Sequence, residues 1–216
     1  MTRAAGEPEV AVVDASSVAG LAADHIVCSL SASIRARGVA HWATTGGSAP
    51  AAVYRELCQP DRRGLVDWDA VHVWWGDDRY VPRDDPRSNV KAVDEILLAG
   101  ESGKAGLPIR VEHLHPFRCG ESIEGGHDAA WCAAALAEEL ASVGPSSPGG
   151  WPILDLVFLG IGSDGHLLSV FPGSAAFDAE EWALAIPAPT HIEPHVERVT
   201  MHPEIIGAAR AILVVV

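Results

Sequence analysis

The sequence predicts an α/β fold with a mostly parallel sheet. Short apolar, β-branched segments alternate with alanine-rich segments of helical periodicity along the whole chain. The segment 154–159 is almost wholly apolar, which is typical of a parallel strand covered by helices on both faces. No internal repeat and no shift in composition marks a domain boundary within the 216 residues. Because such sheets bind ligands beyond the carboxyl ends of their strands, polar motifs at those ends are the candidate sites.

The N-terminal half is expected to contain three strands and three helices. In order they are strand 10–13, helix 17–37, strand 39–45, helix 50–58, strand 71–75 and helix 89–98. In the first helix Leu21, Val27 and Leu30 lie near one face, and Gly38 stands just past its end. Pro50 opens the second helix, where a missing N–H costs nothing.

The C-terminal half continues the alternation. Its predicted elements are an alanine-rich helix 122–142, strand 154–159, a short helix 166–170, strands 182–186 and 196–201, helix 203–210 and strand 212–216. The segment Gly-Pro-Ser-Ser-Pro-Gly-Gly at 144–150 is the clearest loop in the sequence.

Composition narrows the class of partner and the compartment. The net charge is −14, from 29 acidic against 15 basic residues, which argues against a general binder of nucleic acids or anionic membranes but leaves room for a small anionic ligand. The four cysteines show no CxxC pair and the histidines no ligand spacing, so we expect no metal site and no disulfide framework. No secretory signal and no apolar run of about 20 residues is visible. We therefore expect a soluble cytoplasmic protein with no membrane partner.

The first polar motif is Thr-Thr-Gly-Gly-Ser-Ala-Pro at 44–50, a junction from strand to glycines to helix. Gly46 and Gly47 let the backbone approach a ligand, and the helix start offers unpaired N–H groups. The hydroxyls of Thr45 and Ser48 add donors suited to a phosphate. The alternative is a tight turn in which Ser48 is only the helix N-cap. It is not a P-loop, because no Gly-Lys-Ser/Thr follows.

The second motif is Trp-Trp-Gly-Asp-Asp-Arg-Tyr-Val-Pro at 74–82, followed by Ser88 and Asn89. The guanidinium of Arg79, at the carboxyl end of a strand, is well placed to contact an anion or a developing oxyanion. The alternative is a solvated turn in which Arg79 pairs with its acidic neighbours.

The third motif is Gly-Ile-Gly-Ser-Asp-Gly-His at 160–166, after the buried strand. His166 can exchange protons near neutral pH, although a lone histidine is more often structural. No acidic residue follows a strand about twenty residues later, so a dinucleotide site is not expected. A fourth motif, at 194–200, contains Arg198, which by itself would be interpreted as a surface residue.

In this order, the four segments resemble the 6-phosphogluconolactonase family. The matching positions are 45–50, 76–82, 88–89, 160–174 and 197–200, and the resemblance runs from about residue 10 to the end of the chain. The resemblance implies a modified Rossmann-like three-layer α/β sandwich with no obligatory cofactor. It also implies hydrolysis of 6-phospho-D-glucono-1,5-lactone to 6-phosphogluconate, a step of the oxidative pentose phosphate pathway.

The resemblance also assigns roles by position. His166 looks like the general base that activates water, with Asp164 beside it to orient it or the sugar hydroxyls. Arg79 looks like a contact to the substrate and the oxyanion. The phosphate cradle would be formed by Thr45, Gly46, Gly47, Ser48 and Arg198.

The sequence departs from the family pattern at several positions. Thr45 stands where serine is common, Asp78 where glutamate is common, and Ala49 where threonine is frequent. Before Glu197 the family often has a proline-rich stretch that contains a lysine, whereas this chain has Ile-Glu-Pro-His at 192–195. Members follow the strand at 211–216 with another helix, so we expect a single domain, 1–216, that lacks this helix, either because the sequence is a fragment or because the helix is absent by nature.

Two alternative functions belong to proteins on the same scaffold. Glucosamine-6-phosphate deaminases share the fold but carry Phe-Asn-Glu-Pro where this chain has Phe-Pro-Gly-Ser at 171–174, so the lactonase is favoured. A non-catalytic sugar-phosphate-binding module would usually carry a DNA-binding segment, which the length and the charge of −14 do not accommodate. We expect a monomer.

Overall fold

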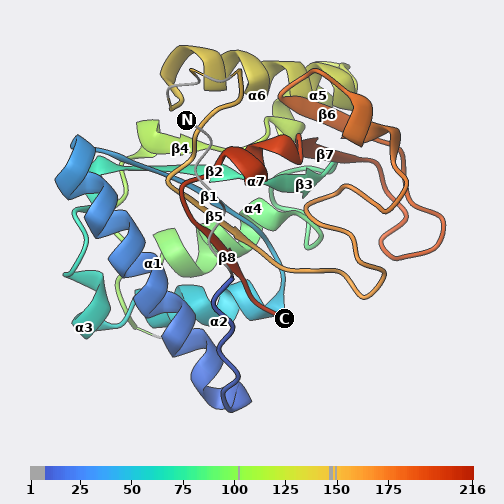
Figure 1. The fold of residues 1–216 in the computed structure, drawn as a ribbon. Coiled ribbons are helices and arrows are strands. Elements are labelled where there is room, and N and C mark those ends of the chain that lie inside the picture. The colour runs from blue at the N-terminus through green and yellow to red at the C-terminus, as the bar shows by residue number, and fades with distance from the viewer. Residues whose placement is uncertain (1–7, 102, 146–147, 149) are drawn as a thin grey trace.

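The computed structural model describes residues 8–101, 103–145, 148 and 150–216. A five-stranded parallel sheet runs through its centre in the order β4-β2-β1-β5-β8 (Figure 1). Its strands are β1 (Ala40–Thr44), β2 (Val71–Trp75), β4 (Leu114–His115), β5 (Leu156–Leu159) and β8 (Ile212–Val214). A smaller antiparallel sheet, in the order β3-β7-β6, consists of β3 (Asp77–Arg79), β7 (Arg198–Met201) and β6 (Ala183–Ile186). The prediction of an α/β fold with a mostly parallel sheet is confirmed.

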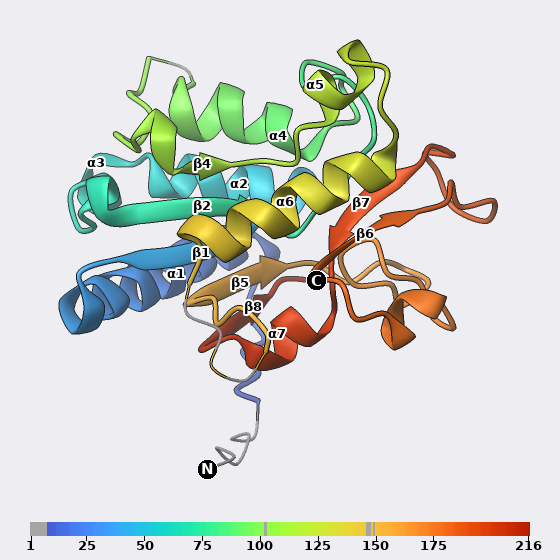
Figure 2. The ribbon, with the colours of Figure 1, turned by 90° about the horizontal axis from the view of Figure 1, so that it is seen from above.

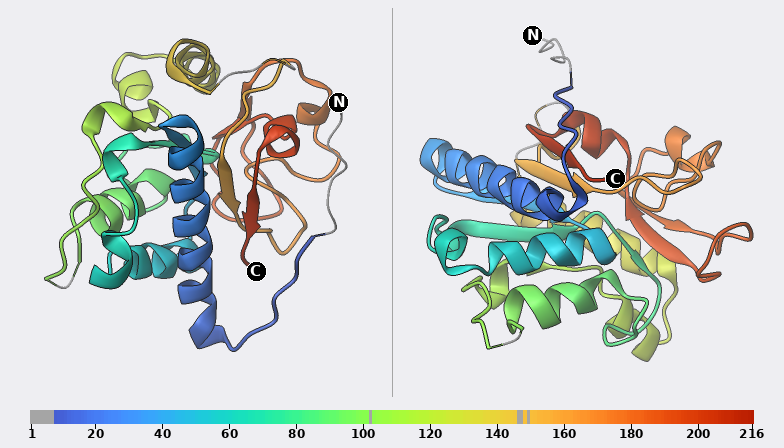
Figure 3. Two further views of the ribbon diagram at one scale, coloured as in Figure 1. Left: turned by 60° about the vertical axis from the view of Figure 1, so that its left-hand side comes forward. Right: turned by 90° about the horizontal axis from the view of Figure 1, so that it is seen from below.

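Helices cover both faces of the parallel sheet, which makes three layers. The helices are α1 (Ala15–Arg37), α2 (Ser48–Leu57), α3 (Pro60–Arg63), α4 (Asn89–Ala92), α5 (Cys119–Glu124), α6 (Ala129–Val143) and α7 (Glu204–Ala208). A π-helical segment, Val93–Leu98, continues α4, and short 3₁₀ turns lie at Trp68–Ala70, Val111–His113 and Ala175–Asp178. Helices α1, α2 and α4 lie on one face (Figure 3). Helix α6 lies on the opposite face, where it packs on β6 and β7 of the smaller sheet (Figure 2).

The core is centred on the inner strands. All residues of β1 and β5 are buried, as a parallel strand between two helical layers requires. Three of the largest buried side chains are Trp42, Trp74 and Phe158. Because these strands are buried on both faces, they give rigid support to the residues at their carboxyl ends.

Helix α1 confirms the predicted helix 17–37 and ends at Gly38, whose φ of +78° suits glycine. By length and composition alone this helix could cross a membrane, which was not expected from the sequence. A third of its apolar stretch is buried, and Ala23, Ile26 and Leu30 are fully buried in the core. Its inner face therefore packs against the sheet.

Two of the predicted elements do not form. The segment 10–13 is not a strand: it pairs with no other segment among the described residues, and Val10 and Val12 are 79% and 92% exposed. The segment 166–170 is not a helix, because Leu167 forms antiparallel bridges with Ile161 and Val170 that fold the chain into a tight loop. Five residues of apolar periodicity were too few to outweigh these contacts.

The predicted helix 122–142 is two helices. Gly125 and Gly126, the latter with a φ of +71°, end α5. The side chain of Asp128 then accepts a hydrogen bond from the N–H of Trp131 and caps α6. Strands β3 and β4 were not predicted, since each has only two or three residues. The predicted loop 144–150 includes residues 146, 147 and 149, which lie outside the described residues, as do residues 1–7.

Four histidines stack at the amino-terminal side of the parallel sheet, away from the carboxyl ends. The ring of His72 lies 4.9 Å from that of His41, 4.0 Å from that of His113 and 5.1 Å from that of His115, between centroids. Burial, reinforced by the neighbouring histidines, lowers the pKa of His41 to about 3 and that of His72 to about 4. Both side chains are therefore neutral in the folded protein at neutral pH.

This stack should make the fold sensitive to acid. Below pH ~6.5 the unfolded chain takes up protons at His41 and His72 that the folded chain refuses, so stability falls as the pH drops towards 4. The free energy of unfolding should fall by at most about 1.4 kcal/mol per pH unit for each histidine. Denaturant unfolding at a series of pH values measures it. His72→Gln should reduce the slope, whereas His25→Gln, on the exposed face of α1, should not; equal slopes in all three proteins would contradict the assignment.

Candidate active site

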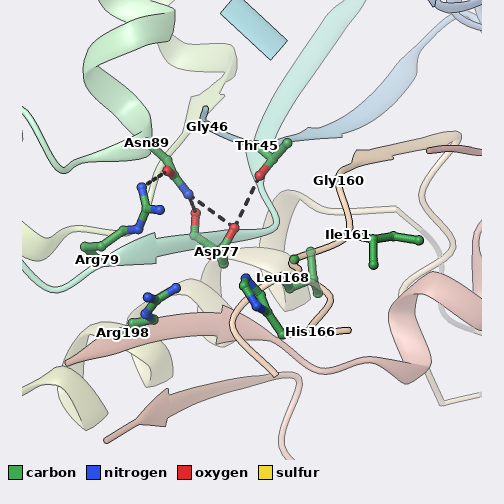
Figure 4. A pocket seen from close by; sticks show the side chains of 11 residues that line it. Thr45, Gly46, Asp77, Arg79, Asn89, Gly160, Ile161, His166, Leu168 and Arg198 are labelled. Atoms are coloured by element: carbon green, nitrogen blue, oxygen red, sulfur yellow. Dashed lines mark hydrogen bonds between the residues drawn. The ribbon is translucent and has the colours of Figure 1, made fainter. Parts of the chain in front are cut away.

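A cavity of about 170 Å³ opens where β1 and β5 end and the smaller sheet begins. Segments far apart in the chain meet there (Figure 4). The lining residues are Thr45, Gly46, Asp77, Arg79, Asn89, Gly160, Ile161, Gly162, His166, Leu168 and Arg198. Five of the residues predicted from the sequence thus share one cavity: Thr45, Gly46, Arg79, His166 and Arg198.

Two arginines give this cavity a positive charge. Arg79 on β3 and Arg198 on β7 are directly paired in the antiparallel register. Among the described residues neither forms an ion pair, and the Nε atoms of both are buried without a hydrogen-bond partner. Arg198 is buried and Arg79 is partly buried. Because charges taken out of water without a counter-charge are costly, the two guanidinium groups in one cavity favour an anionic ligand.

Arg198 is the more deeply placed of the two, with 2% of its surface exposed. Its guanidinium carbon lies 5.3 Å from the centre of the Phe171 ring, a cation–π contact. Burial, together with the charge of Arg79, lowers the pKa of Arg198, but a guanidinium keeps its charge in proteins. The interpretation of Arg198 as a surface residue is therefore wrong.

The position of Arg79 is set by Asn89. The Nη1 atom of Arg79 donates to Asn89 Oδ1 at 2.5 Å and to the carbonyl oxygen of Arg87 at 3.0 Å. Asn89 Nδ2 in turn donates to the carbonyl oxygen of Asp77 at 2.9 Å. The alternative of a solvated turn in which Arg79 pairs with acidic neighbours does not describe the structure.

The carboxylate of Asp77 ties three segments together at the cavity. Its Oδ2 accepts from Ser169 Oγ at 2.6 Å, and its Oδ1 accepts from Thr45 Oγ1 at 3.4 Å and Asn89 Nδ2 at 3.2 Å. These contacts join the end of β1, the start of α4 and the loop before residue 170. The arginines are thereby held on a rigid support rather than on a free loop.

The neighbouring Asp78 has a structural role outside the cavity. It is 1% exposed, and burial raises the pKa of its carboxyl group to about 7 against the opposing effect of its hydrogen bonds. Its carboxylate accepts from the backbone N–H groups of Arg79 and Asn89 and from the hydroxyl of Ser88. It thus fixes the turn that connects β3 to α4.

His166 is held by Asp164. The Nδ1 atom lies 2.5 Å from Asp164 Oδ1, and the backbone N–H of His166 donates to the same oxygen at 3.2 Å. The imidazole N–H holds the pKa of Asp164 well below its usual range, with a smaller effect from His191. Because an ionised carboxylate only accepts hydrogen bonds, Nδ1 carries the proton, and in the neutral imidazole Nε2 is then an acceptor.

The glycine at position 162 is required by this arrangement. A Cβ atom there would lie 2.1 Å from His166 Nδ1 and 2.8 Å from Asp164 Oδ1. We expect Gly162→Ala to displace the imidazole and to reduce turnover by about 10-fold or more, because small misplacements of a reacting group are costly. Steady-state kinetics with circular dichroism as a fold control test this. Gly150→Ala is unsuitable as a control because its φ is +94°, whereas Gly64→Ala, with open space around it, should behave as the wild type.

The glycine turn after β1 approaches the cavity closely. A Cβ on Gly46 would lie 2.0 Å from Asn89 Oδ1, so only glycine fits there. Gly47, with a φ of +114°, is the N-cap of α2, and the prediction that Ser48 is the N-cap is wrong. Gly47 and Ser48 are exposed and do not line the cavity.

Some contributors to the site were not singled out from the sequence. Asp77 and Asn89 stood inside quoted motifs, and their polarity next to a strand end was an available signal. Phe171 also stood inside a quoted motif, at 160–174, but His191 carried no local signal, because only the fold brings it to Asp164. Among the described residues there is no cluster of three His, Cys, Asp or Glu side chains that could hold a metal ion.

The fold and the cavity define an α/β protein with a small cavity that is lined by two arginines and by a histidine held by a carboxylate. The model of one family, described as glucosamine-6-phosphate isomerases/6-phosphogluconolactonase, matches residues 13–216. The chain belongs to this family.

Individual relatives agree with this assignment. The chain is 31% identical over 204 residues to a 6-phosphogluconolactonase of Mycobacterium leprae. The match spans 94% of this chain and 78% of the relative. It is 32% identical over 144 residues to that of Haemophilus influenzae, where the match spans 67% of this chain and only 55% of the relative. A solved structure, 6-phosphogluconolactonase from Trypanosoma brucei, is similar with a TM-score of 0.80 and 30% identity, over 96% of this chain and 81% of that one.

Proposed function

We propose that the protein hydrolyses 6-phospho-D-glucono-1,5-lactone to 6-phosphogluconate, a step of the oxidative pentose phosphate pathway. The observation that carries the proposal is that His166, held by Asp164 at 2.5 Å, lines the same cavity as two arginines that have no carboxylate partner among the described residues. A base and a cationic surface are what this ester hydrolysis of a phosphorylated substrate needs. The relatives named 6-phosphogluconolactonase support the assignment.

At the phosphate end, Arg198 is the main cation. Its guanidinium is already desolvated, so an anion gains a strong charge-assisted contact at little further cost. Thr45 and Gly46 line the same cavity, and Gly47 and Ser48 begin α2, whose first N–H groups lack partners within the helix. This set forms the phosphate cradle.

At the reacting end, His166 is the general base. Its Nε2 takes a proton from water as the water oxygen attacks the lactone carbonyl carbon, and Arg79 stabilises the oxyanion that forms. The bond from the carbonyl carbon to the ring oxygen then breaks, and the proton passes to that oxygen. Asp164 keeps the imidazole in the required tautomer. The reaction balances without a cofactor and without a covalent enzyme intermediate.

The deaminase alternative is disfavoured by the loop 171–174. In this chain the segment is Phe-Pro-Gly-Ser, and the side chain of Ser174 accepts a hydrogen bond from the N–H of Ala176. No carboxylate stands at the position of the deaminase glutamate. We also place the activity in the cytoplasm, since the four cysteines are all free, and we expect the domain to act as a monomer.

The test is a progress curve with freshly prepared lactone. Acid release in a pH-stat should be faster with the protein than without it and should scale with protein concentration. Rates equal to the spontaneous blank would refute the proposal. Ammonia release from glucosamine 6-phosphate, measured in parallel, would support the deaminase instead.

A further inference from the structure

The carboxylate of Asp164 is shared by two histidines. Its Oδ1 lies 2.5 Å from His166 Nδ1, and its Oδ2 lies 2.8 Å from His191 Nε2. The ring of Phe171 lies beside both imidazoles, at 5.0 Å from His166 and 5.1 Å from His191 between centroids. His191 stands in the segment between β6 and β7 and does not line the cavity. Among the described residues, its hydrogen-bonded link to the reacting group runs through Asp164.

The charged groups around the two imidazoles differ. His166 lines the cavity into which β3 presents Asp77 and Arg79 and β7 presents Arg198. Its side chain is 17% exposed, whereas that of His191 is 54% exposed. Within the segment that holds His191, His195 pairs with Glu193 at 3.0 Å and with the carbonyl oxygen of Pro189 at 2.7 Å, so it does not compete for Asp164.

One carboxylate can stabilise one neighbouring imidazolium well, and a second proton on the pair is opposed by repulsion. The more hydrated histidine, which is outside the cavity of the two arginines, is the better place for that proton. Charge on His191 then opposes charge on His166. Its N–H also holds the carboxylate in the rotation that points Oδ1 at His166.

We propose that His191 is a positioning residue, which carries the proton that Asp164 attracts and so leaves Nε2 of His166 free to accept a proton from water. This role rests on the proposed lactone hydrolysis. It gives one residue of the loop before β7 a part in the reaction, although His191 does not line the substrate cavity.

The test compares three variants with the wild type. His191→Gln places an amide nitrogen near the position of Nε2, so it keeps a donor to Asp164 but removes the charge. We expect the midpoint of the acid limb of kcat/KM to move upward by about half a pH unit to one unit, with little change in the plateau. His191→Leu removes the donor as well and should also lower the plateau. His195→Gln is the matched control on the same segment and should leave the profile unchanged.

A second measurement does not depend on turnover. The Cε1–H resonance of His166 is followed by NMR against pH in the wild type, in His191→Gln and in His195→Gln, without substrate. The midpoint should rise in His191→Gln alone. An unchanged or lowered midpoint would overturn the proposal even if the protein is a lactonase. If instead the rate of lactone hydrolysis with the protein equals the spontaneous rate while this midpoint rises, the proposed function is wrong and the coupling of the two histidines is still supported.

Discussion

His166→Ala should lower kcat for 6-phosphogluconolactone about 100-fold or more. The imidazole Nε2 is the atom that takes the proton from water, and general-base catalysis typically contributes ~10²–10⁴-fold. The side chain is 17% exposed and, among the described residues, its only hydrogen-bond partner is Asp164. That carboxylate is 22% exposed and is also bonded to His191, so removal of the imidazole leaves no buried acceptor without a partner. The fold should therefore survive the change.

The measurement is initial-rate kinetics at several pH values, with the spontaneous hydrolysis subtracted. His25→Ala, on the exposed face of α1, is the matched control and should retain wild-type kcat. Turnover of His166→Ala close to that of the wild type would remove His166 from the role of base. A loss of the circular dichroism signal would instead indicate unfolding. Asp164→Asn, a smaller change beside the same group, would then help to separate the effect of unfolding from the loss of the base.

Arg198→Met should raise KM about 10-fold to 100-fold with a smaller effect on kcat. Hydrogen bonds to charged groups contribute about 1.5–3 kcal/mol, which corresponds to this range. The stability should not fall in proportion, because Arg198 is 2% exposed in the free protein and its Nε has no hydrogen-bond partner in the part of the chain that the structure describes. Replacing an uncompensated buried charge with an apolar side chain of similar length can be neutral or stabilising.

Kinetics across a range of substrate concentrations, together with denaturant unfolding, test both parts of this expectation. Arg118→Met is the control, since Arg118 is a half-exposed arginine that pairs with Glu139 at 3.3 Å away from the cavity. A fall in kcat with unchanged KM would assign Arg198 to the reacting end of the substrate rather than to the phosphate.

Much of the site could be predicted because its parts are local. Gly46, Arg79 and His166 each follow a strand and stand in a polar motif with glycine, and the carboxyl ends of strands that belong to one sheet meet at one edge. The roles of these residues were inferred from a family resemblance. Their presence in one cavity is an observation of the structure.

Errors arose where local patterns compete with contacts from elsewhere. The alanine-rich run 122–142 kept helical periodicity across Gly125 and Gly126, but the backbone turns there. The apolar run 166–170 has the composition of a short helix, whereas pairing of Leu167 with Ile161 and Val170 decides its shape. A segment as short as 166–170 has too little intrinsic helical preference to outweigh such contacts.

The sequence by itself determined the kind and order of most elements and the chemical groups available to the site. The periodicity of hydrophobic residues and the glycine turns are local properties, so they can be predicted from the sequence. Only the tertiary structure decided that Arg79 and Arg198 lie opposite each other on two neighbouring strands and that both lack a carboxylate partner among the described residues. It also decided that Asp164 is shared by His166 and His191. Those facts depend on which distant segments pack together and on which charges are left unpaired when they do.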